Sequence, residues 1–144
     1  MTKQDYTLSI SAPVSASEAY DKIARVSEWW AKNFQGSARN VGDVFTVHIG
    51  ETSVDFKIAE AVPGSRVVWH VTNCFLPWLK DKTEWNDTNV VFEVSASPSE
   101  TTVTMTHEGL TPEVPCFDTC EKGWDQYFGQ SFRQFLTDGC GVPQ

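Results

Sequence analysis

His107 is the residue whose type and setting could do acid–base chemistry. It lies in the segment TTVTMTHE, where alternation places it on the same side as Val103 and Met105. An imidazole in such an apolar setting could orient a carbonyl group or act as a general base near neutral pH. A histidine that only makes structural hydrogen bonds is the alternative. His107 is therefore a candidate catalytic residue, and Glu108 faces the other side.

The other histidines and the cysteines could in principle bind a metal. His48 and His70 share the opposite phase, but the segment 53–61 should separate them. Cys116 and Cys120 would share one helical face, where they could bind metal, be oxidised or simply pack. The four cysteines show no CxxC pair and no metal-finger spacing: Cys74, Cys116, Cys120 and Cys140. We expect buried, reduced thiols and no metal.

Familiar catalytic motifs are absent from the chain. The sequence has no GxSxG elbow, no phosphate-binding GxxxxGK loop and no dinucleotide-binding GxGxxG. We therefore expect no nucleotide cofactor, nor any other cofactor, and no serine-hydrolase triad.

Alternating segments predict the sheet that would position these residues. An opening strand covers Tyr6 to Ile10 and ends before Pro13. Tight turns are compatible with Gly50-Glu51 and Pro63-Gly64, so the later segments should pair as antiparallel neighbours. Five further strands follow in a meander: DVFTVHI, SVDFKIAEA, RVVWHVTN, NVVFEVSA and TTVTMTHE.

Helical spacing appears at both ends of the chain. Ser15 to Glu18 forms a capping box for a first helix that should run to about Val26, and Ser27 could cap a short second helix with Trp29 and Trp30. The segment 116–138 predicts a long final helix that stops at Gly139. Within that helix, Gly123 and Gly129 could permit close packing or leave room for a ligand. The fold class is therefore α+β.

Bulky side chains on the inward face of the strands and on the final helix could line a ligand pocket. Such a pocket needs large apolar walls and a few polar groups that fix orientation. A solid, dry core is the alternative. The predicted ligand-binding residues are Phe45, Phe56, Trp69, Phe92, Met105, His107, Trp124 and Phe128.

The segment CFLPWLKDKTEWND, residues 74–87, interrupts the alternation with large apolar residues, among them Phe75, Trp78 and Trp85. Exposed loops rarely carry so many such groups. We expect the segment to fold back as a lid over the interior, and contact with a partner protein is the alternative.

Length and charge limit the remaining possibilities. At 144 residues, the chain fits one domain, residues 1–144. The net charge of -8 repels nucleic acid and anionic lipid. No apolar run is long enough for a membrane helix, and no signal-peptide core follows Met1. We therefore expect a cytoplasmic protein with no nucleic-acid partner and no membrane insertion.

Three stretches carry a resemblance to a known family: SISAPVSASEAYDKIARVSEWW, VTMTHEGL and KGWDQYFGQSFRQFLTDG. Together with the order of elements, they resemble the START-like or polyketide cyclase (SRPBCC) superfamily, and within it the heat-shock-protein ATPase activator homologue family. The resemblance implies a helix-grip fold, in which a curved antiparallel sheet wraps around a long C-terminal helix. Two short N-terminal helices complete this fold. It also implies a cavity for apolar molecules. Members often carry a histidine shortly before the Gly-Trp pair, where this chain has Cys120 and Glu121.

Three functions remain open. The first is non-catalytic binding of a small hydrophobic ligand, such as a lipid, a polyketide or another aromatic molecule. The second is a small enzyme of cyclase, aromatase or hydrolase type that uses His107 in the same cavity. The third is a chaperone-accessory role in stress response, which the resemblance implies. Either a monomer or a homodimer is compatible with the sequence.

Overall fold

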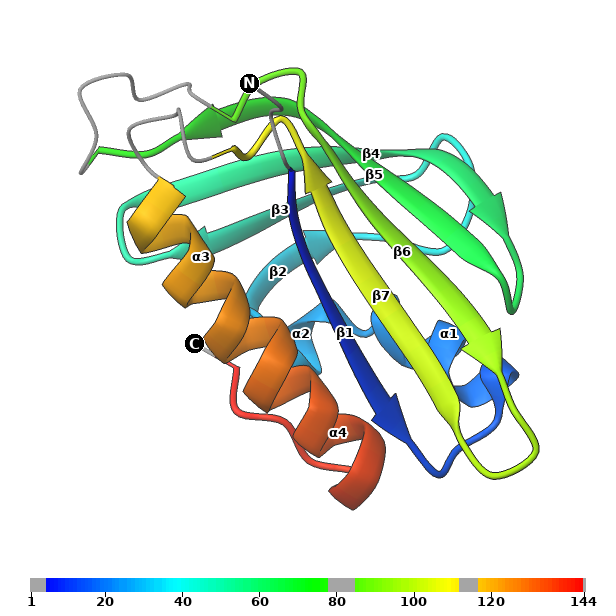
Figure 1. Cartoon of the computed structure of the whole chain (residues 1–144). Coiled ribbons are helices and arrows are strands. Elements are labelled where there is room, and N and C mark those ends of the chain that lie inside the picture. Colours follow the sequence, from blue (N-terminus) through cyan, green and yellow to red (C-terminus); the bar gives the residue numbers. More distant parts are fainter. Residues whose placement is uncertain (1–4, 78–84, 112–116, 144) are drawn as a thin grey trace.

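The computed structural model describes residues 5–77, 85–111 and 117–143. One seven-stranded antiparallel sheet dominates it, in the order β1-β7-β6-β5-β4-β3-β2 (Figure 1). The predicted opening strand and five-strand meander are confirmed. The strands are β1 (Tyr6–Ala12), β2 (Asn33–Gly36), β3 (Val44–Ile49), β4 (Thr52–Val62), β5 (Arg66–Phe75), β6 (Asn89–Ala96) and β7 (Thr101–Glu108).

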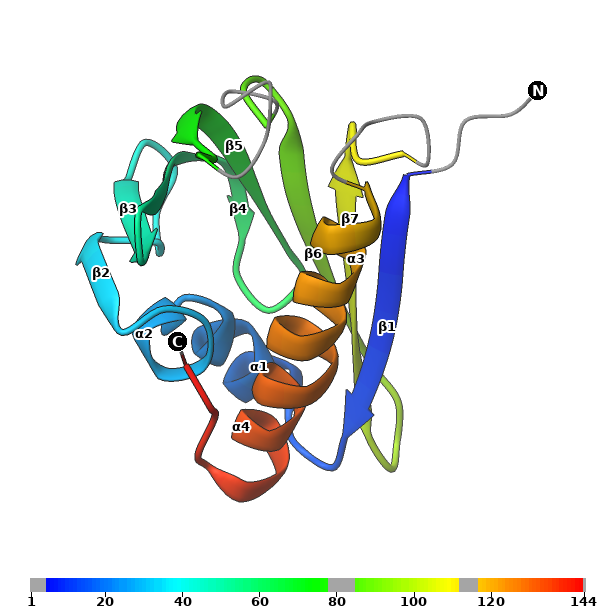
Figure 2. The ribbon, with the colours of Figure 1, turned by 90° about the vertical axis from the view of Figure 1, so that its left-hand side faces the viewer.

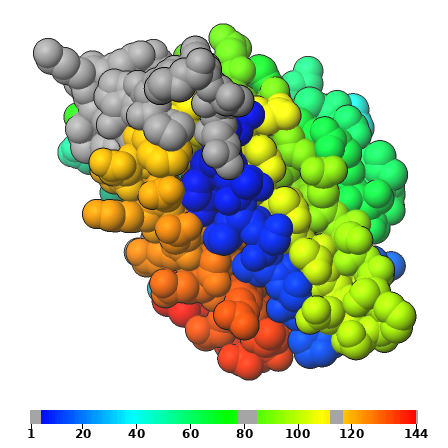
Figure 3. Space-filling view, in the orientation of Figure 1, coloured from blue at the N-terminus to red at the C-terminus, as the bar shows by residue number. Residues whose placement is uncertain are grey.

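A long helical run lies in the concave face of the sheet, as the helix-grip prediction requires. It consists of α3 (Phe117–Gln126), a π-helical segment η1 (Tyr127–Phe132) and α4 (Arg133–Asp138). Figure 2 shows the sheet curving around this run, with α1 (Ala16–Ile23) and α2 (Val26–Trp29) at one end. In the space-filling view, the run, β1 and β7 form one continuous surface (Figure 3).

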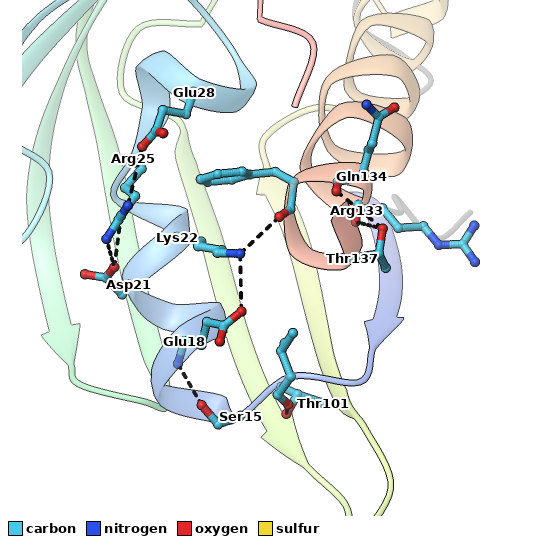
Figure 4. Close-up of polar contacts among 12 residues, drawn as sticks. Ser15, Glu18, Asp21, Lys22, Arg25, Glu28, Thr101, Arg133, Gln134 and Thr137 are labelled. Atoms are coloured by element: carbon cyan, nitrogen blue, oxygen red, sulfur yellow. Dashed lines mark hydrogen bonds and ion pairs between the residues drawn. The ribbon is translucent and has the colours of Figure 1, made fainter. Parts of the chain in front are cut away.

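The first helix begins where its capping box predicts. The Ser15 hydroxyl accepts the backbone N–H of Glu18 at 3.1 Å. The Glu18 carboxylate pairs with Lys22 at 3.2 Å, and Lys22 also donates to the backbone oxygen of Phe135 at 3.1 Å (Figure 4). This contact ties α1 to the last helix.

The predicted bounds of the two short helices were wrong. The first helix ends at Ile23 rather than near Val26, because the backbone turns there and Arg25 donates to the carbonyl of Lys22. The second helix starts at Val26 with Arg25, not Ser27, in the capping position. Trp30 closes α2 instead of lying inside it.

Two elements had not been predicted. Strand β2, with the sequence NFQG, is four residues long and has a single large apolar residue, so it shows no alternation. The final helix contains the π-helical segment η1, whose wider turn keeps Phe128, Ser131 and Phe132 on the buried side. The C-terminal stop at Gly139 is confirmed, since this glycine adopts φ 80° after α4.

The strand faces follow the predicted alternation. The inward residues named for the ligand pocket are all buried, while the outer face of β1 and β7 carries hydroxyl pairs such as Ser9 with Thr104 at 2.8 Å. Among the helices of the described residues, none is long and apolar enough to cross a membrane.

Candidate functional site

A cavity of about 320 Å³ lies between the β3–β4 hairpin and the start of the final helix. Figure 2 shows these two elements on opposite sides of the opening of the curved sheet. The lining comes from five separate parts of the chain and carries no charged residue among the described positions. It consists of Trp30, Val47, Ile49, Thr52, Val54, Leu76, Trp85, Thr119, Cys120, Gly123, Trp124 and Tyr127.

Most of the predicted ligand-binding residues lie next to this cavity rather than in its wall. Of the eight, only Trp124 lines it. Five of the others form a packed aromatic cluster together with Trp29 and Phe132: Phe45, Phe56, Trp69, Phe92 and Phe128. Met105 is buried, and His107 contacts the rings of Trp85 and Trp124. Typical contacts are Trp69 with Phe92 at 4.6 Å and Phe45 with Phe56 at 4.9 Å between ring centroids. For these positions the structure favours the solid-core alternative.

The predicted lid residues are placed in three different ways. Trp85 is buried and lines the cavity, whereas Phe75, at the end of β5, is 44% exposed. Trp78 lies outside the described residues. Leu76, from the same segment, is buried in the cavity wall. The parts of the segment that the structure describes thus supply one wall of the cavity.

Hydrogen bonds hold Trp85 and Trp124 in place through His107. The Trp124 indole Nε1–H donates to His107 Nδ1 at 3.1 Å, and His107 Nε2 lies 2.9 Å from the Thr88 hydroxyl. That hydroxyl donates to the backbone oxygen of Trp85 at 2.7 Å. We assign the proton of neutral His107 to Nε2, because Nδ1 must accept from the indole. Each donor and acceptor in this series of hydrogen bonds, from Trp124 through His107 and Thr88 to the backbone oxygen of Trp85, then has a partner.

Burial keeps His107 neutral. The side chain is fully buried, and this desolvation lowers its pKa from 6.5 to about 3. Protonation would also set a second N–H against the Trp124 indole N–H. His107 does not line the cavity, and both of its nitrogens are used. It therefore positions two cavity walls, and it has no free nitrogen for a substrate proton.

The turn before β6 is fixed to the sheet on both sides. Asp87, at φ 66°, donates its backbone N–H to Val71, and Val71 donates to Thr88, both at 2.9 Å. Gly109 leaves room for Thr88, since a Cβ at this glycine would come within 2.7 Å of the Thr88 methyl. The stretch THEG, residues 106–109, thus helps to hold Trp85 in place, because His107 and Gly109 both contact Thr88.

The sequence left two roles open for the glycines of the final helix, close packing and room for a ligand, and each glycine has one of them. A Cβ on Gly129 would lie 3.0 Å from Leu8 on β1, so this glycine permits close packing. Gly123 lines the cavity, where a Cβ would make only an ordinary 3.5 Å contact with Tyr127. Gly123 therefore leaves room in the cavity.

The described residues hold no cluster of the histidine and cysteine candidates for a metal. In the part of the chain that the structure describes, no group of three or more His, Cys, Asp or Glu side chains could hold a metal ion. Strand β4 separates His48 from His70, as expected. Cys74 and Cys120 are buried and Cys140 is exposed, while Cys116 lies outside the described residues.

Sequence reasoning missed most of the cavity wall. Trp30 was predicted in a short helix, and nothing in its local pattern says that it faces Trp124, whose ring centroid is 5.0 Å away. Thr52 and Leu76 lie at strand ends, where alternation stops. The useful signal was the Gly123-Trp124 pair, which combines an empty position and a large ring on adjacent residues.

Comparison with known families and structures fits this geometry. Residues 18–137 match the family described as activator of Hsp90 ATPase homolog 1-like protein. No curated protein matches the chain.

Solved structures with the same fold share little sequence with the chain. The Aha1 dimer from Colwellia psychrerythraea is 19% identical with a TM-score of 0.78, covering 96% of this chain and 99% of that one. DynU16, a putative protein in the dynemicin biosynthetic locus, is 16% identical with a TM-score of 0.73, covering 94% of this chain but 48% of its own. CalU16 from Micromonospora echinospora is 14% identical with a TM-score of 0.68, covering 93% and 74%. The family match covers most of the chain, and the chain therefore belongs to the activator of Hsp90 ATPase homolog 1-like family, within the START-like superfamily.

Proposed function

We propose that this protein binds a small hydrophobic molecule in the cavity between the β3–β4 hairpin and α3. The observation that carries the proposal is a cavity whose described wall is largely apolar and holds no charged residue, beside a closely packed core. Small-molecule sites in proteins are typically concave and mostly apolar, with a few polar groups, and this space of about 320 Å³ has that character. That volume lies at the lower end of the range of small-molecule pockets.

Burial of apolar surface would supply most of the affinity. Transfer of ligand surface out of water contributes roughly 25 cal/mol per Å² before the costs of association. The aliphatic wall of Val47, Ile49 and Val54 offers such surface without any competing charge. Affinity should therefore rise with the apolarity of the ligand among molecules of similar size.

Catalysis through His107 has less support. A general base must reach the proton that it removes, and His107 stands behind Trp85 and Trp124 with both nitrogens hydrogen-bonded. A low pKa keeps it neutral but does not give it access to a substrate. The cyclase or hydrolase alternative would need a different base, and the described cavity wall holds no carboxylate.

A cavity-filling variant tests the proposal directly. Gly123→Leu places a side chain into the space, whereas Gly123→Ala adds one methyl group at a position where a Cβ fits. We expect the neutral fluorescent probe N-phenylnaphthylamine to bind the wild type and Gly123→Ala, and to bind Gly123→Leu at least about tenfold more weakly. Thermal unfolding of all three proteins provides the control for folding. Equal affinity in Gly123→Leu, or no binding to the wild type, would contradict the proposal.

A chaperone-accessory function is the second candidate, because the matching family is described by that activity. Its test is the rate of ATP hydrolysis by Hsp90 with and without this protein. An unchanged rate would argue against it.

A homodimer is supported by the dimeric Aha1 structure, and light scattering of the purified protein would measure the mass. The cytoplasmic location stays a prediction.

A further inference from the structure

We infer that Ser131 is a positioning residue for the cavity: its hydroxyl group holds Trp30, a residue of the cavity wall, in place against the final helix. Ser131 itself does not line the cavity. The inference rests on the proposed ligand-binding function and adds a residue on which that function depends. The hydrogen bonds of Ser131, the backbone position of Trp30 and the packing of residues 139–143 carry it.

The Ser131 hydroxyl joins three segments of the chain. The side chain is 3% exposed and lies in the π-helical segment η1. Its hydroxyl donates to the backbone oxygen of Trp29 at 2.6 Å and accepts the backbone N–H of Val142 at 2.7 Å. These roles are fixed, because a carbonyl oxygen can only accept a hydrogen bond and a backbone N–H can only donate one. One buried hydroxyl therefore links α2, η1 and the segment of residues 139–143.

The bond to Trp29 bears directly on Trp30. The Trp29 carbonyl belongs to the planar peptide group that joins these two residues, and a four-residue helix such as α2 leaves its last carbonyl oxygens without partners inside the helix. Ser131 supplies the missing donor. The N–H of the same peptide group donates to the oxygen of Val26 at 2.8 Å. Both polar atoms of the peptide group that precedes Trp30 are therefore held, one within α2 and the other by the final helix.

Trp30 forms part of the cavity wall together with residues of the final helix. Its ring centroid lies 5.0 Å from that of Trp124 and 6.2 Å from that of Tyr127. Ser131 follows Tyr127 by four positions, so η1 supplies both a wall residue and the hydrogen bond that holds Trp30 beside it. Without that bond, the end of α2 is free to move relative to the final helix. Such movement would lower affinity, because a ligand would then have to order the wall on binding.

Residues 139–143 cover this contact from outside. Figures 1 and 2 show the segment (red) turning back from α4 toward α2. A Cβ at Gly141 would lie 2.5 Å from a backbone oxygen of α2 and 3.1 Å from the Ser131 hydroxyl oxygen, so a residue without a side chain permits this close approach. The approach brings the Val142 N–H to Ser131 and buries the hydroxyl group.

Two variants break the arrangement from different segments. Ser131→Ala removes the hydroxyl, and Gly141→Ala places a methyl group against the backbone of α2. We expect Ser131→Ala to bind N-phenylnaphthylamine about five- to tenfold more weakly than the wild type. Gly141→Ala should bind it about two- to threefold more weakly, since it displaces residues 139–143 but keeps the hydroxyl that donates to Trp29. Gly141 lies outside the helices and the sheet, so this second variant should fold even if Ser131→Ala does not.

Thr101→Val is the matched control. The Thr101 side chain is also buried, and its hydroxyl also donates to a backbone oxygen at 2.6 Å, that of Val14, but neither residue lines the cavity. Valine keeps the shape of the side chain and removes the hydroxyl. Thermal unfolding should show that Thr101→Val and Ser131→Ala are both less stable than the wild type. The probe should nevertheless bind Thr101→Val as tightly as the wild type, whereas a purely structural role of Ser131 would give the two variants the same affinity.

The indole N–H signal of Trp30 in NMR spectra measures the position of this residue without a ligand. Once Trp30→Phe and Trp85→Phe have assigned the two signals, the Trp30 signal should shift in ligand-free Ser131→Ala. The signal of Trp85, which lines the cavity from outside α2, should shift much less. Thr101→Val should leave both signals unchanged.

The outcomes separate this inference from the proposed function. If the wild type binds the probe and Ser131→Ala binds it equally well, or if Ser131→Ala and Thr101→Val lose affinity alike, Ser131 does not position the cavity wall and the inference is wrong. If the wild type does not bind the probe, the proposed function fails. In that case the Trp30 signal still decides whether Ser131 positions Trp30, and an unchanged signal in Ser131→Ala would overturn the inference as well.

Discussion

The packed aromatic cluster and the cavity are neighbouring regions that both contain large aromatic side chains, but only the cavity leaves free space between them. In the cluster, Trp69 has ring neighbours on several sides, including Phe45, Phe56 and Phe92 within 5.4 Å. In the cavity, rings cover one side, and the position of Gly123 is empty. Aromatic content alone therefore does not predict a binding site. The difference is made by where the strands end and by one missing side chain.

The largest effect should come from truncation inside the packed cluster. Phe92→Ala removes a fully buried ring that lies 4.6 Å from Trp69 and 5.9 Å from Phe128, and we expect it to lower the free energy of unfolding by about 3–5 kcal/mol. Ile49→Ala in the cavity wall, where the side chain is only half-buried, should cost less than half of that. Urea unfolding measures both. Equal costs would mean that the two regions do not differ in packing.

Acid should lower the free energy of unfolding through His107, which is hydrogen-bonded to Trp124 in the cavity wall. The unfolded chain binds a proton on this histidine below its ordinary pKa of 6.5, whereas the folded chain does so only near pH 3. The contribution of His107 to stability is thus complete above pH 6.5 and is lost as the pH falls toward 3. We expect about 2 kcal/mol to be lost between pH 7 and pH 5 from this residue.

His107→Gln isolates that contribution. A glutamine amide can still accept from Trp124 and donate to Thr88, but it does not titrate. The difference in unfolding free energy between wild type and variant should therefore shrink as the pH falls from 7 to 5. If the unfolding free energies of the wild type and of His107→Gln change in the same way with pH, His107 is not held neutral by burial.

Sequence patterns predicted the cluster better than the cavity, for a physical reason. Alternation fixes which face a strand residue takes, so Phe45, Trp69 and Phe92 were correctly assigned to the interior. It does not say whether the opposing layer reaches them. The cavity depends on Trp30, which directly follows α2, on strand ends near Thr52 and Leu76, and on the turn at Trp85. None of these positions has a periodic signal.

Tertiary contacts decided the remaining features. Trp124, seventeen positions after His107, donates a hydrogen bond to it, and nothing local in either segment indicates this contact. The π-helical segment is likewise invisible in a pattern of period 3.6, because it changes the phase of the buried residues without changing their types.

The two helix glycines should give the smallest effect on stability. Gly123→Ala faces the cavity and should raise the free energy of unfolding by up to ~1 kcal/mol, because alanine has the higher helix propensity. Gly129→Ala should gain less, since its Cβ would meet Leu8 at 3.0 Å. Thermal unfolding of the two variants measures the difference. A larger gain at Gly129 would mean that Leu8 moves aside freely and that the contact with β1 is loose.

The most direct test of the comparison is an NMR titration of the indole N–H signals with N-phenylnaphthylamine, in which single Trp→Phe variants assign the signals. Trp30, Trp85 and Trp124 line the cavity, whereas Trp29 and Trp69 lie in the packed cluster. We predict that the signals of the first three shift on binding and that those of Trp29 and Trp69 move much less. The largest shifts at Trp29 and Trp69, or no shift at Trp30, Trp85 and Trp124, would show that the ligand does not occupy this cavity.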